Sequence, residues 1–222
     1  MSKAAVQGIA PESAPLPRSR STSAEARGLH GLQGMAGFVL GGLMALVASM
    51  APAVWSDDPA ISPARYLGYM AGGAMGGVMM VWGYPRKKVV TAAALGFGVS
   101  FLAPAFLAAP QVDALMTISP DAYGTGTYLS CLFAFGVSYG LAGAVGMALA
   151  VPGAFLRAGA AFAFSGAVGG LITAFGPSLG GPDHLAGMFR MILLMMLGHV
   201  VAFTLGGWLS GVALQSFRRK VR

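Results

Sequence analysis

His199 is the residue of this sequence with the clearest potential for chemistry, because it lies near the middle of an apolar segment. Met195, Met191 and Met188 precede it in steps of four, four and three residues, so one helix face would carry an imidazole and three thioethers. A histidine inside a membrane either serves a solute path or hydrogen-bonds a neighbouring helix. Both alternatives remain open at this point.

Thioether and imidazole ligands together suit the soft ion Cu(I). The methionine pairs, including Met75 and Met79, resemble the Met-xxx-Met elements of copper-transporting membrane proteins, and this resemblance implies a soft cation. Methionine is also a flexible apolar filler. The single cysteine, Cys131, lies in an apolar stretch, and no external Met/His tract accompanies it. We therefore predict no metal and no cofactor.

Hydroxyl groups could supply a nucleophile. Residues 164–171, Phe-Ser-Gly-Ala-Val-Gly-Gly-Leu, are similar to the nucleophile segment of rhomboid intramembrane proteases, which implies Ser165 as nucleophile and His199 as base. Three departures count against this reading: Ala163 replaces a glycine, the two residues are too close for a whole intervening span, and the upstream His and Asn have no counterpart. We expect no enzyme. His199, Ser165, Thr173 and Met195 remain candidates for lining a pore or holding a ligand.

The composition predicts an all-α membrane protein. Of the 222 residues 56% are apolar and 9% are charged, and the mean hydropathy is +0.71. Six segments approach the ~20 residues that a membrane-crossing helix needs. They lie at 33–54, 66–84, 89–109, 128–150, 154–176 and 187–214.

The basic residues predict the orientation. With six spans, 12 of the 14 Lys and Arg residues fall on one side, and all five aspartates fall on the other. Basic residues collect on the cytoplasmic side, so both termini are expected there, in a multi-pass protein of the inner (plasma) membrane. The basic residues do not form a patch interleaved with aromatics, so we expect the lipid bilayer and no nucleic acid as partner.

Three regions follow from this pattern. Residues 1–30 read as a disordered cytoplasmic tail, 31–216 as the transmembrane domain and 217–222 as a basic cytoplasmic tail. A cleaved signal peptide ending near Ala51-Pro-Ala53 is the alternative for the first segment.

An internal repeat suggests two related halves. Residues 73–85 and 166–177 nearly repeat each other, each in the middle segment of three, which gives halves at about 31–110 and 128–214. Halves with an odd number of spans must be inverted, so we expect a 3+3 inverted repeat whose middle segments are bent and pack together. Small residues four apart permit close helix contact. The glycines expected at such contacts are Gly73, Gly76, Gly77, Gly166, Gly169 and Gly170.

Two functions fit this architecture. No Asp, Glu or Lys lies inside a predicted span, which disfavours ion-coupled transport. The first hypothesis is a small uncoupled channel or facilitator for a small solute or cation. The alternative is a non-catalytic structural or assembly subunit of a larger membrane complex. A homo-oligomer or a larger complex is expected in either case.

Overall fold

The computed structural model describes residues 22–50, 63–82, 87–118, 123–177 and 185–218. This part of the chain is helical and contains no strand. The elements are α1 (Thr22–Met50), α3 (Pro63–Met80), α4 (Lys87–Ser100), α5 (Leu102–Leu107), α6 (Ala109–Thr117), α7 (Thr125–Ala150), the short 3₁₀ helix η3 (Pro152–Ala154), α8 (Phe155–Phe175) and α9 (Leu185–Arg218).

Four helical stretches are long and apolar enough to cross a membrane, which indicates a multi-pass membrane protein. They are Lys87–Leu115, Thr125–Ala150, Pro152–Phe175 and Ile192–Gln215. In α1 the described apolar stretch, Gly31–Val47, is shorter, and α3 is rich in glycine and carries Arg65. By length and composition, four of the six predicted spans are therefore supported, and the two over α1 and α3 stay predictions.

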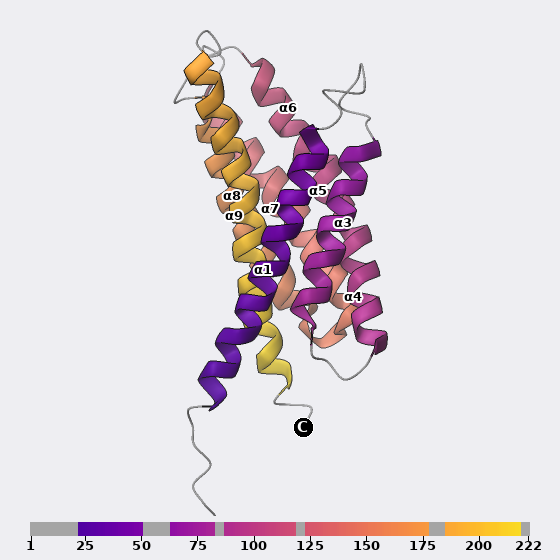
Figure 1. The fold of residues 1–222 in the computed structure, drawn as a ribbon. Coiled ribbons are helices and arrows are strands. Elements are labelled where there is room, and N and C mark those ends of the chain that lie inside the picture. Colours follow the sequence, from indigo (N-terminus) through magenta and orange to yellow (C-terminus); the bar gives the residue numbers. More distant parts are fainter. Residues whose placement is uncertain (1–21, 51–62, 83–86, 119–122, 178–184, 219–222) are drawn as a thin grey trace, which may run out of the picture.

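The long helices run alternately up and down and close into a ring. In chain order α1 packs against α3, α3 against α4, α4 against α7, α7 against α8, α8 against α9, and α9 returns to α1. Figure 1 shows that α1 begins and α9 ends at one end of the bundle, while α6 lies at the other. We call these the Lys87 end and the Asp113 end.

This ring does not have the order that the predicted inverted repeat requires. A two-fold axis in the membrane plane would reverse the order of helices around the bundle, whereas exchanging the two halves here preserves it. The expected middle segments, in α3 and α8, lie on opposite sides of the bundle (Figure 1), and each is one continuous helix. The simpler explanation of their sequence similarity is that both helices need glycines for close packing.

The third apolar rod is interrupted twice. Phe101 separates α4 from α5, and Ala108 separates α5 from α6. Pro104, predicted to kink this span, lies just beyond the first interruption and has no N–H to donate to the carbonyl of Ser100. Phe101 nevertheless keeps right-handed helical backbone angles and donates its N–H to the carbonyl of Phe97, so the break is confined to a single turn of the rod.

The chain ends differ in part from the predicted tails. Helix α1 begins at Thr22, so residues 22–30 of the expected disordered tail are helical. Helix α9 continues through Arg218, into the expected basic tail. The rest of both tails, 1–21 and 219–222, lies outside the described residues, as does the alternative cleavage site.

Candidate functional site along the bundle axis

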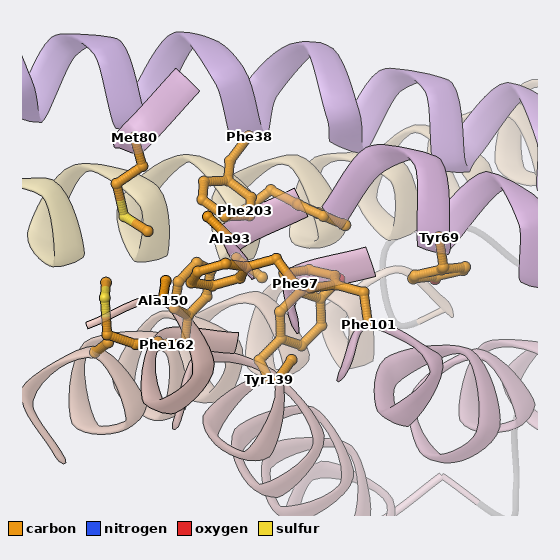
Figure 2. Close-up of a cluster of buried hydrophobic side chains, with 14 of the residues drawn as sticks. Phe38, Tyr69, Met80, Ala93, Phe97, Phe101, Tyr139, Ala150, Phe162 and Phe203 are labelled. Carbon is orange, nitrogen blue, oxygen red and sulfur yellow. The ribbon is translucent and has the colours of Figure 1, made fainter. Parts of the chain in front are cut away.

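Five phenylalanine rings fill the axis of the helix ring. They come from α1, α4, the break after α4, α8 and α9, and each is completely buried (Figure 2). Phe101 is central to them, because its ring centroid lies 5.1 Å from that of Phe203, 5.6 Å from that of Phe38 and 5.8 Å from that of Phe162. We call this group the aromatic plug; its members are Phe38, Phe97, Phe101, Phe162 and Phe203.

Glycines make room for the plug. A Cβ atom built on Gly73 would lie 2.8 Å from the side chain of Phe101, and one built on Gly76 would overlap the ring of Phe38. On α9, a Cβ atom at Gly206 would overlap the ring of Phe162. Phenylalanine rings on one helix therefore face glycines on the next, and the interior is closely packed around the plug.

Four further rings, three of which carry polar groups, lie next to the plug, toward the Asp113 end. They stand on α3, α7 and α9, and we call them the polar ring cluster: Tyr69, Phe135, Tyr139 and His199. The imidazole of His199 contacts the ring of Phe135 edge-on, with centroids 4.8 Å apart, and lies 6.3 Å from the ring of Tyr69. Tyr139 stacks on Phe135 and touches Phe203, which joins the cluster to the plug.

The geometry of His199 fixes its tautomer. Its Nδ1 lies 3.1 Å from the carbonyl oxygen of Met195, one turn earlier on α9. A carbonyl oxygen can only accept, so Nδ1–H donates this bond. In the neutral ring, the Nε2 atom is then a hydrogen-bond acceptor.

Within the polar ring cluster, the hydroxyl group of Tyr139 is buried without a compensating hydrogen bond among the described residues. The side chain is completely buried, and its hydroxyl oxygen has no hydrogen-bond partner among the described residues. A buried hydroxyl without a partner costs free energy.

An ion pair lies at the Asp113 end. Arg65, one turn before Tyr69 on α3, donates from both terminal nitrogens to the carboxylate of Asp113 on α6, at 2.7 and 3.1 Å. The Arg65 side chain is 7% exposed and that of Asp113 is 43% exposed. The pair therefore ties the end of the interrupted third rod to α3, with the cation on the inside.

The predicted hydroxyl candidates do not converge on His199. Ser165 donates to the carbonyl of Phe162 and Thr173 donates to the carbonyl of Gly169, so both are satisfied by their own helix. Thr173 does lie against Gly198, the neighbour of His199 on α9. The side chain of Met195 belongs to a separate buried cluster that contains Leu115, Cys131 and Ala174.

The six predicted packing glycines all lie where helices meet. Gly73 and Gly77 face α4, Gly76 faces α1, Gly166 and Gly170 face α7, and Gly169 faces α9. Equivalent glycines of the repeat thus face non-equivalent helices, in agreement with the ring order described above.

Two features of the site were not predicted from the sequence. The aromatic plug and the polar ring cluster do leave a pattern in the sequence, because several of their rings are four residues apart and so share a helix face. These pairs are Phe97/Phe101, Phe135/Tyr139 and His199/Phe203. The Arg65–Asp113 pair joins residues 48 positions apart and has no local signal. No group of three or more His, Cys, Asp or Glu side chains that could hold a metal occurs in the described part of the chain.

Comparison with protein-family models, with curated proteins and with solved structures finds no match to this chain. The fold and the site define it by class alone: a multi-pass helical membrane protein whose bundle buries Arg65 and His199 and is filled along its axis by the aromatic plug.

Proposed function

We propose that this protein is a small uncoupled facilitator for a small solute, here in its closed form. The six long helical rods would all cross the membrane, with both chain ends in the cytoplasm and the Asp113 end outside, as the distribution of basic residues suggests. The protein is proposed to be non-enzymatic and to act in the inner membrane as a homo-oligomer.

One observation carries this proposal: the axis of the bundle holds His199 and the hydroxyl of Tyr139, which has no hydrogen-bond partner among the described residues, rather than aliphatic side chains alone. Polar groups inside a membrane protein are costly and are usually retained for function. They lie between the Arg65–Asp113 pair and the aromatic plug, so the plug would separate them from the Lys87 end while the Asp113 end would remain accessible.

In the proposed closed form, Phe101 would block the axis. This ring contacts Phe38, Phe97, Tyr139, Phe162 and Phe203, and it lies at the first interruption of the third rod. A change of backbone conformation at that interruption would withdraw it from the axis. Opening would then need movement in one rod and no rearrangement of the whole ring.

Flux through reconstituted vesicles tests the proposal. Phe101→Ala should shorten the plug and raise the permeability of the vesicles to small solutes such as urea, glycerol and acetate at least severalfold above the unmodified protein. Phe133→Ala is the matched control, because Phe133 on α7 is 63% exposed on the outer surface of the bundle. Equal permeability for a folded Phe101→Ala protein and the control would refute the facilitator.

A non-catalytic assembly subunit is the second candidate. The close packing of the plug favours it, as do Ser138, Ser165, Thr173 and Thr204, whose hydroxyl groups are bonded to carbonyls of their own helices. This candidate predicts that the protein purifies from its native membrane with a constant set of other subunits. It also predicts that Phe101→Ala affects stability or assembly but not permeability.

A further inference from the structure

We propose that Arg65 is a receptor for a small carboxylate, and that Asp113 occupies this site when no ligand is present. The proposal rests on the proposed function and names its substrate class. It begins from the geometry of the pair: Nη1 and Nη2 of Arg65 each meet one oxygen of the same carboxylate. This two-pronged arrangement matches any carboxylate, whether it belongs to the protein or to a solute.

Arg65 is more deeply buried than Asp113, as the exchange of one carboxylate for another requires. The guanidinium is held inside the bundle, while the carboxylate reaches it from the exposed side, with 43% of the Asp113 side chain accessible. Asp113 can therefore leave toward water, and a solute can take its place by the same route. The side chain of aspartate ends in a CH₂–COO⁻ group, so the vacated space has the size of acetate.

Arg65 also has an unused donor. Its Nε atom is buried and has no hydrogen-bond partner among the described residues. A carboxylate that moves inward from the position of Asp113 can accept from Nε. The next side chain on this face is Tyr69, whose ring centroid lies 6.3 Å from that of His199 in the polar ring cluster.

Acetate binding to the purified protein tests this assignment. Thermal stability and calorimetric titration would compare sodium acetate with sodium chloride at equal ionic strength. Acetate should stabilise the unmodified protein more than chloride does, because a ligand that binds the folded state stabilises it. Arg65→Lys keeps the charge but loses the fork, and should abolish this difference. Arg190→Lys, at an exposed position at the start of α9, should preserve it.

Changes at Asp113 separate a receptor from a simple structural pair. Asp113→Asn removes the internal competitor and should tighten the apparent Kd for acetate about tenfold, because the bound form no longer has to displace a tethered carboxylate. Asp113→Ala should be destabilised in chloride and restored by acetate. The assignment is overturned if acetate and chloride act alike on the unmodified protein, or if Arg65→Lys leaves the acetate effect intact.

The binding and flux experiments can fail separately. Acetate binding that depends on Arg65, combined with unchanged permeability of Phe101→Ala, would keep the receptor and reject the facilitator. Raised permeability without any specific effect of acetate would keep the facilitator and reject this substrate class.

Discussion

At the scale of single residues, Tyr139 separates function from packing most clearly. Its hydroxyl is buried without a partner among the described residues, so the folded protein gains nothing from it. Tyr139→Phe should therefore keep or raise the apparent melting temperature, by an amount equivalent to at most about 1 kcal/mol. If the hydroxyl contacts a permeating solute, the same change should lower the flux through the Phe101→Ala protein. A clear loss of stability would show that the hydroxyl has a structural partner.

His199 offers a second test at this scale, through its two nitrogen atoms. Nδ1–H donates to the carbonyl of Met195, whereas Nε2 of the neutral ring is an acceptor. The amide of asparagine can replace Nδ1–H, and the longer side chain of glutamine can place an oxygen near Nε2. His199→Gln should retain more flux than His199→Asn in vesicles, with comparable protein abundance in the membrane. The opposite ranking would assign His199 to helix packing.

At the scale of helices, the glycine contacts were predictable and their partners were not. The spacing of small residues marks which faces pack closely, because close approach of backbones needs a missing side chain. The sequence of α3 contains nothing that specifies whether Gly73 and Gly77 meet α4 or α8. That choice depends on the order of all helices around the ring, which is a property of the whole chain.

Gly77 on α3 tests the importance of these contacts. A Cβ atom at this position would lie 2.7 Å from the carbonyl oxygen of Ala93, a backbone atom that cannot rotate away. Gly77→Leu should overpack the interface of α3 and α4 and destabilise the protein by about 1–3 kcal/mol. Ala71→Leu, at an exposed position of the same helix, should leave the melting temperature nearly unchanged. Equal effects of the two changes would mean that the helices approach each other differently.

At the scale of the whole molecule, the sequence predicted a helical membrane protein and the positions of most apolar segments. It did not predict the aromatic plug along the axis. Phe38, Phe101 and Phe162 come from helices far apart in the chain, and their convergence depends on tertiary packing. The predicted inverted repeat illustrates the same limit, because the glycine pattern of 73–85 and 166–177 records local packing and leaves the order of helices undetermined.

The proposed orientation can be tested with single cysteines in a Cys131→Ser background. A cysteine at position 121 should react with a membrane-impermeant thiol reagent added outside intact cells, and a cysteine at position 87 should react only after the cells are opened. These two positions flank the third apolar rod, so they must lie on opposite sides if Lys87–Leu115 crosses the membrane. Labelling of position 87 from outside would reverse the orientation.

Access to position 199 tests the central claim most directly, because it requires no knowledge of the solute. His199→Cys in the Cys131→Ser background would be exposed to a small thiol reagent from each side of sealed vesicles. We predict reaction only from the Asp113 side while the plug is intact, and reaction from both sides once Phe101→Ala is added. Absence of reaction from either side in both proteins would contradict the facilitator and leave a sealed bundle whose role is assembly.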